Sequence, residues 1–68
     1  MSDSVYKTVD IVGSSSKSIE DAVGGAVAKA AKTVKNLSWF EVGEIRGHIE
    51  NDKVAHYQVA MKLGFRLD

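Results

Sequence analysis

Strict alternation of apolar residues with polar or small ones between Ala55 and Leu67 is the feature that most constrains the fold of this chain. Successive side chains of a strand point to opposite faces, so such a segment buries one face and leaves the other available. The apolar face carries Ala55, Tyr57, Val59, Met61, Leu63, Phe65 and Leu67. A half-buried strand needs partner strands and a covering layer, which the rest of the chain must supply.

Two further strands are predicted. Residues 4–12 are rich in Val, Ile, Tyr and Thr, which suit a pleated, half-buried surface. A second strand begins at Trp39 and runs to about Ile49, but its parity breaks between Val42 and Ile45, which predicts a bulge near Gly43. The short Asn-Asp-Lys turn that follows joins this strand to the alternating one as a long hairpin.

An amphipathic helix is predicted between the first strand and the hairpin. Apolar residues, mostly Ala and Val, recur at steps of three and four through residues 19–34 and form one narrow stripe. We expect Ser15 or Ser16 to cap the start of the helix, because a serine hydroxyl accepts a hydrogen bond from the first turn. Asn36 is the expected cap at the other end.

Glycines inside the helical segment have a structural interpretation. Gly24 and Gly25 are unfavourable in a helix and indicate the close approach of another backbone. The complete order is β-α-β-β. The sequence therefore predicts one α+β domain over residues 1–68, with a three-stranded antiparallel sheet wrapped around one helix.

The small size of the chain limits how much surface it can bury, and so how stable it can be, as a single copy. A domain of 68 residues buries only about 60% of the surface of its unfolded chain. The sequence has no cysteine, so it has neither a disulfide nor a thiolate metal site. His48 and His56 flank the hairpin turn, and we interpret them as exposed strand residues that face each other rather than as a metal pair. Assembly of several copies is therefore expected.

Charge and motifs exclude several function classes. The nine basic and nine acidic residues balance, which argues against nucleic-acid binding. Neither a secretory signal nor an apolar run long enough to span a membrane is present, so we expect a cytoplasmic protein without membrane contact. Glycine-rich phosphate loops and a nucleophile elbow are also absent, and no enzymatic activity is predicted.

Candidate ligand-binding residues lie on the polar face of the hairpin. A solvated sheet face is the plain interpretation of this pattern. Gln58 offers an acceptor beside two donors, which match a ring edge carrying a carbonyl next to an N–H. Trp39 offers a flat surface for stacking. Isoalloxazine, pyrimidine and purine rings all satisfy both. The residues on the polar face are Arg46, His48, His56, Gln58, Lys62 and Arg66.

Four segments carry a resemblance to a known family. They read YKTVDIVGSS, AVAKAAKTVKNL, WFEVGEIRGHI and YQVAMKLGFRL, and they extend over nearly the whole chain. With these segments the chain resembles the dodecins of bacterial type, which are small flavin-binding proteins. The resemblance implies a hollow dodecamer with cubic symmetry, in which pairs of flavins are stacked between tryptophans of neighbouring subunits.

The resemblance also assigns residues. Trp39 matches the stacking tryptophan, Gln58 the glutamine that binds the pyrimidine edge, and Arg46 an arginine that contacts the flavin. Ser38 stands where many members have Asp. FMN is the flavin expected for this type, with riboflavin as the alternative. Close stacking on Trp39 implies that photoexcited flavin is quenched by electron transfer from the indole.

Coenzyme A is a second ligand implied by the resemblance. Lysine charges attract phosphates, and an arginine plane stacks on adenine. The positions that match or lie near such contacts are Tyr6, Lys7, Lys29, Thr33, Lys35 and Arg66. Two other functions stay open: an enzyme that depends on flavin or on coenzyme A, and an assembly module without a ligand.

Overall fold

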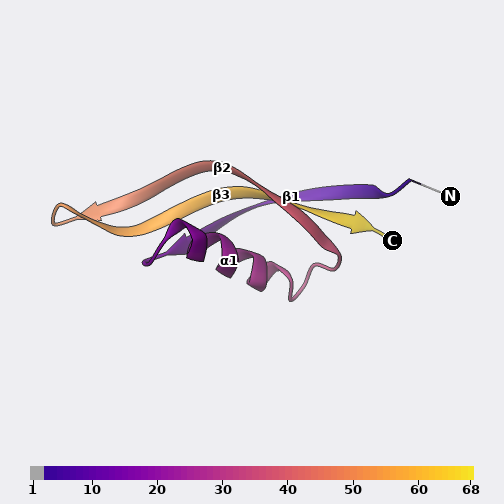
Figure 1. The fold of residues 1–68 in the computed structure, drawn as a ribbon, viewed down its shortest axis with the longest axis horizontal. Helices are drawn as coiled ribbons and strands as arrows, with labels where there is room; N and C mark the ends of the chain where they lie inside the picture. Colours follow the sequence, from indigo (N-terminus) through magenta and orange to yellow (C-terminus); the bar gives the residue numbers. More distant parts are fainter. Residues whose placement is uncertain (1–2) are drawn as a thin grey trace.

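One sheet with a single helix packed against it makes up the structure, a computed structural model that describes residues 3–68 (Figure 1). The central strand is β3, which pairs antiparallel with β1 on one side and with β2 on the other. The predicted β-α-β-β order and the three-stranded antiparallel sheet are confirmed. The elements are β1 (Val5–Ser15), α1 (Ile19–Ala30), β2 (Leu37–Glu50) and β3 (Lys53–Leu67).

The β2–β3 hairpin has the predicted turn and bulge. Asn51 and Asp52 at its tip have φ values of 52° and 64°, the left-handed conformation of a two-residue type I′ turn. The register shifts between Val42 and Ile45, as their parity requires. Because of this shift, Ile45 returns to the face that packs toward α1 and pairs with Val59. The bulge therefore keeps the apolar residues of β2 on one side of the sheet.

Strand β1 is longer than predicted, because Gly13 and the two residues after it continue the pairing with β3. A Cβ on Gly13 would collide with the carbonyl oxygen of Ala22 and lie 3.0 Å from the Cβ of Ala26. Gly13 is therefore the glycine that permits close packing of helix on sheet. Gly24 and Gly25 do not have this role within the chain, since a Cβ on either meets nothing within 4 Å apart from the adjacent residues and the nearby backbone of the helix itself.

The start of α1 lies later than predicted. Ser18 is the cap, and its hydroxyl accepts a hydrogen bond of 2.9 Å from the backbone N–H of Asp21. The prediction of Ser15 or Ser16 was wrong because β1 runs through Ser15. The hydroxyl of Ser15 instead accepts from the N–H of Lys17 at 2.9 Å and donates to the Asp21 carboxylate at 2.7 Å.

The helix also ends earlier than its apolar pattern indicates. After Ala30 the backbone tightens into a final turn, in which the N–H of Thr33 donates to the Ala30 carbonyl at 3.1 Å. Asn36 does not cap the helix, and its φ of 64° redirects the chain into β2. Its carbonyl accepts the N–H of Arg66 at 3.1 Å. Among residues 3–68 no helix is long and apolar enough to cross a membrane.

The hydrophobic core lies between α1 and the middle of β1 and β3. Its fully buried members are Ala22, Val59, Met61 and Leu63. Twelve helical residues span about 18 Å, whereas the fourteen residues of β2 span about 46 Å. The helix therefore covers only part of the sheet, and the hairpin tip projects beyond it (Figure 1). No residue of β2 is buried in the single chain.

Candidate functional site

The face of the sheet that is turned away from α1, here called the outer face, carries most of the predicted ligand-binding residues. In an antiparallel sheet, residues paired across strands project from the same face. The pairing therefore arranges the outer face in rows that cross the three strands. The rows are Tyr6–Arg66, Thr8–Gly64–Trp39, Asp10–Lys62–Glu41, Ser14–Gln58–Arg46 and His56–His48.

Trp39 lies flat on the outer face over the backbone of Gly64. A Cβ built on Gly64 would overlap three neighbouring atoms of the indole, Cε2, Cζ2 and Cη2, at nearly equal distances. Near-equal distances to three consecutive ring atoms mean that the ring turns its face, not its edge, toward Gly64. Trp39 keeps 43% of its surface exposed. One face of the indole is thus covered by the sheet and the other is open.

Tyr6 closes one side of the same tryptophan. The two ring centroids are 5.1 Å apart with an interplanar angle of 65°, an edge-to-face arrangement. From the sequence, Tyr6 was predicted to match or lie near a coenzyme A contact, and no role was predicted for Gly64. The signal for Gly64 was present, because it is a residue without a side chain in the middle of an otherwise regular strand.

Gln58 and Arg46 form the polar part of the outer face. The Nε of Arg46 donates to the Oε1 of Gln58 at 3.3 Å, and Arg46 also lies 3.5 Å from the carboxylate of Glu44. This arrangement fixes the orientation of the Gln58 amide and turns its NH₂ group away from Arg46. The amide retains two donors and one acceptor lone pair for a ligand.

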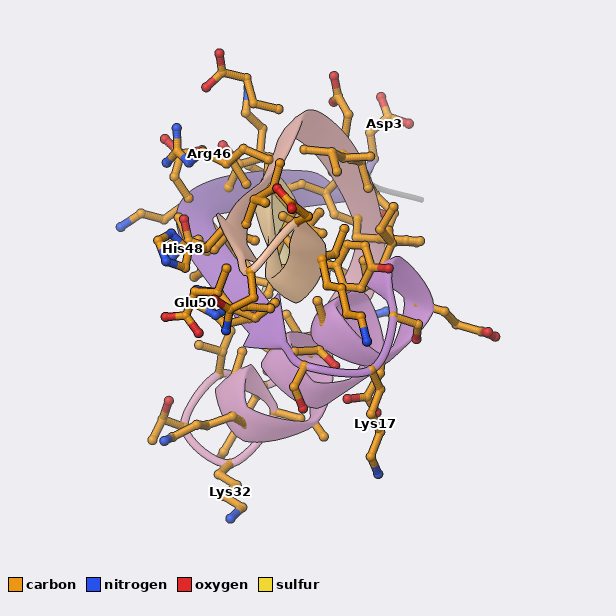
Figure 2. All side chains as sticks on the ribbon, turned by 90° about the vertical axis from the view of Figure 1, so that its left-hand side faces the viewer. Asp3, Lys17, Lys32, Arg46, His48 and Glu50 are labelled. Carbon is orange, nitrogen blue, oxygen red and sulfur yellow. The ribbon has the colours of Figure 1, made fainter. Side chains whose placement is uncertain are left out.

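The two histidines face each other across the hairpin, as predicted. Their rings are stacked with centroids 5.5 Å apart, and His48 Nε2 lies 3.5 Å from the Glu50 carboxylate. Figure 2 shows Arg46, His48 and Glu50 projecting to the same side of the hairpin. Within residues 3–68, no group of three or more His, Cys, Asp or Glu side chains is arranged to hold a metal ion.

The aromatic and polar parts of the site are well separated in one chain. The Gly64 row and the Gln58 row are six residues apart along β3, which corresponds to about 20 Å. A shallow groove of about 540 Å³ lies between them, and its lining includes Gly43, Ala60 and Lys62. The stacking surface at Trp39 and the polar residues around Gln58 are therefore different parts of the outer face.

The remaining predicted residues do not gather at one point. Ser38 donates its hydroxyl hydrogen to the carbonyl of Asn36 at 3.0 Å, so that hydrogen is already used inside the chain. Of the residues assigned to coenzyme A, Tyr6 and Arg66 pair on the outer face, whereas Lys7 alternates to the opposite face. The other three, Lys29, Thr33 and Lys35, lie at the end of α1 or in the turn after it. Coenzyme A binding stays a prediction.

Fold and site together define a small β-α-β-β protein with an exposed aromatic stacking surface and a separate polar row on the same sheet face. The profile of one family, described as Dodecin, matches residues 5–68. The chain belongs to the dodecin family. A curated protein named Dodecin, from Thermus thermophilus, is 50% identical over 64 residues, which cover 94% of this chain and 93% of the relative.

Solved structures show the same fold. The structure of dodecin from Streptomyces coelicolor has 47% sequence identity and a TM-score of 0.93, with coverage of 100% of this chain and 97% of that one. A more distant neighbour comes from Mycobacterium tuberculosis and is described as a calcium-chelating immunodominant antigen, calcium dodecin, with a novel calcium-binding site. It has 29% identity and a TM-score of 0.80, covering 94% of this chain and 91% of its own.

Proposed function

We propose that this protein binds flavin, most favourably FMN, and stores it in a form protected from light-driven chemistry. The observation that carries the proposal is the single open face of Trp39, which lies flat on the sheet and remains 43% exposed. A large exposed aromatic ring held in one orientation suits the stacking of a planar ligand, because its orientation is fixed before binding. Membership of the dodecin family points to the flavin as that ligand.

A second copy of the chain completes the site in this proposal. One Trp39 stacks on only one side of a ligand, so a ligand pair covered on both outer sides needs a tryptophan from each of two chains. Trp39 and Gln58 also lie in rows six residues apart along β3, so the stacking surface and the polar group are different parts of the outer face. In the assembly, which we propose to be a homododecamer, Gln58 binds the pyrimidine edge of a flavin and Arg46 both orients Gln58 and contacts the flavin.

Storage follows from how the ring is enclosed. Flavins stacked between two indoles have both ring faces covered, which excludes water and small oxidants from them. Photoexcited flavin accepts an electron from the adjacent indole, and rapid charge return dissipates the excitation. An enzyme would need an open edge at flavin N5 and a place for a hydride donor, and the sandwiched pair provides neither. The proposed function is therefore binding and not catalysis.

The test is a titration of FMN, and separately of riboflavin, into the ligand-free protein while flavin emission is followed. We expect emission to fall and to saturate near one flavin per chain, and the stronger ligand to be FMN. Trp39→Ala should weaken binding and restore emission. Gln58→Ala should weaken binding by about 1–3 kcal/mol through the unpaired ring edge, with quenching of the bound fraction retained.

Three results would contradict the proposal. Unchanged emission on addition of either flavin would favour the assembly module without a ligand. Retained binding and quenching in Trp39→Ala would exclude the stacking arrangement. Turnover of NADH by the flavin-loaded protein would favour the enzyme.

A further inference from the structure

We propose that Gly64 and Tyr6 are positioning residues of the flavin site, which hold the Trp39 indole flat on the outer face before any ligand arrives. The inference rests on the proposed function for the identity of the ligand. The arrangement itself belongs to the chain without ligand, so it is tested separately from flavin binding.

The contact with Gly64 determines the height and tilt of the indole. Trp39 and Gly64 are cross-strand partners, so the two residues project from the same face at the same point along the sheet. The ring occupies the space in which any other residue at position 64 would place its Cβ. Even alanine would collide with the ring carbons and force the ring to lift or rotate.

A glycine in the interior of a long strand is unfavourable, because it contributes no side chain and loses more backbone freedom than other residues. A glycine within β3 therefore indicates a local contact that excludes a side chain at this position. Gly43 on the neighbouring strand provides the contrast, since a Cβ there has ordinary contact at 3.6 Å with the Ala60 carbonyl oxygen and meets no ring. The close approach of Trp39 is the reason for Gly64 that the structure shows.

Tyr6 restricts the indole from a second direction. It lies one row further along the sheet, in the row it shares with Arg66, and its ring meets that of Trp39 edge to face at 5.1 Å. The sheet and Tyr6 together leave one indole face open. A side chain that is already ordered in the free protein loses less freedom on binding, so both contacts favour ligand affinity.

The first experiment needs no ligand. Trp39 is the sole tryptophan, so intrinsic emission and its quenching by acrylamide report on this ring alone. We expect Gly64→Ala to raise the acrylamide quenching constant at least twofold and to shift the emission maximum. Gly24→Ala is the matched glycine control, because a Cβ at Gly24 meets nothing within 4 Å. Equal quenching in Gly64→Ala and in the unchanged protein would overturn the proposal.

The second experiment separates a contact with Trp39 from a general need for glycine at this position. Urea midpoints are measured at one fixed protein concentration for Gly64→Ala, Trp39→Ala and the double variant. We expect Gly64→Ala to lower the midpoint in the presence of Trp39 and to leave it unchanged or raised in the Trp39→Ala protein. An equal loss in both backgrounds would overturn the inference.

The third experiment measures FMN affinity. We expect at least a tenfold loss in Gly64→Ala, with the assembly retained by sedimentation velocity, and no change in Gly24→Ala. If Gly64→Ala does not fold, Tyr6→Ala decides the question, with a loss of at least threefold expected and a return toward the original affinity in Tyr6→Phe. Unchanged affinity in a folded Gly64→Ala, or in Tyr6→Ala where Gly64→Ala does not fold, would overturn the inference. Absence of FMN binding by the unchanged protein would overturn the proposed function, and the first two experiments would still test the positioning.

Discussion

Strands β3 and β2 are hydrogen-bonded neighbours with opposite environments. Leu63 of β3 is 1% exposed, whereas Phe40, its partner across the pair, is 48% exposed. Both project toward the side of the sheet on which α1 packs. The difference arises because α1 packs its apolar residues over β1 and β3. An open cleft lined by Val27, Phe40 and Leu63 separates α1 from β2.

The contrast between β3 and β2 indicates that one part of the sheet stabilises the fold and another part is available for binding. The covered part, β1 with β3 and α1, supplies the core that a chain of this size has available. The uncovered strand β2 carries Trp39, Arg46 and the apolar side chains that a single chain leaves in water. In the proposed function the same strand stacks the ligand through Trp39, and we expect neighbouring chains to cover its exposed apolar residues, such as Phe40. Four predictions test how far this division holds, beginning with the largest expected effect on stability and ending with the smallest.

Leu63→Ala should have the largest effect. Leu63 is among the largest fully buried side chains, and truncation of such a residue costs about 2–5 kcal/mol through lost burial and the cavity left behind. Urea unfolding at fixed protein concentration measures this loss. A cost below about 1 kcal/mol would show that β3 is not the centre of the core, and the contrast between the two strands would then fail.

The sequence predicted the fold well for a physical reason. The alternation from Ala55 to Leu67 fixes which face of the central strand is buried, and the Asn-Asp turn fixes its partner. Boundaries were harder to predict, because Ser15, Ser16 and Ser18 all have the chemistry of a helix cap. Only the pairing of β1 with β3, which runs as far as Ser15, selects Ser18.

The site was predictable as a list of residues but not as an arrangement. Trp39 and Gln58 were identified from their chemistry, but the rows of the sheet reveal how far apart they lie. The contacts of Trp39 with Gly64 and Tyr6 join three different strands. Such contacts depend on register, and a register shift of two residues at the Trp39 end of β2 would remove them without any change visible in the local pattern.

Phe40→Ser should affect assembly more than the single chain. Half of the Phe40 surface is already exposed, so the cost to one chain should be only about 1 kcal/mol. We expect this ring to pack against another copy in the proposed assembly, so its loss should produce smaller species in sedimentation velocity. If the species keep their size and the chain loses as much stability as in Leu63→Ala, Phe40 belongs to the core of its own chain.

Gly47→Ala should show that β2 has one closely packed position. A Cβ on Gly47 would lie 2.7 Å from the carbonyl oxygen of His56, and backbone cannot yield as a flexible side chain does. We expect a loss of about 1–3 kcal/mol in urea unfolding. Gly43→Ala, whose added Cβ has ordinary contact at 3.6 Å, is the control on the same strand and should change stability by less than about 0.5 kcal/mol. Equal effects would mean that the hairpin adjusts freely near its tip.

Gly24→Ala should have the smallest effect and the opposite sign. Gly24 lies inside α1 and a Cβ there meets no atom of its own chain within 4 Å, so alanine should stabilise the helix by about 0.5–1 kcal/mol. Urea unfolding should show this gain as a higher free energy of unfolding. Hydrogen exchange should slow mainly in α1, where the substitution lies. A loss of stability would instead show that Gly24 lies against a neighbouring chain. The helix would then contribute to the assembly as well as to the core, and the division between a covered core and an exposed interface strand would no longer hold for α1.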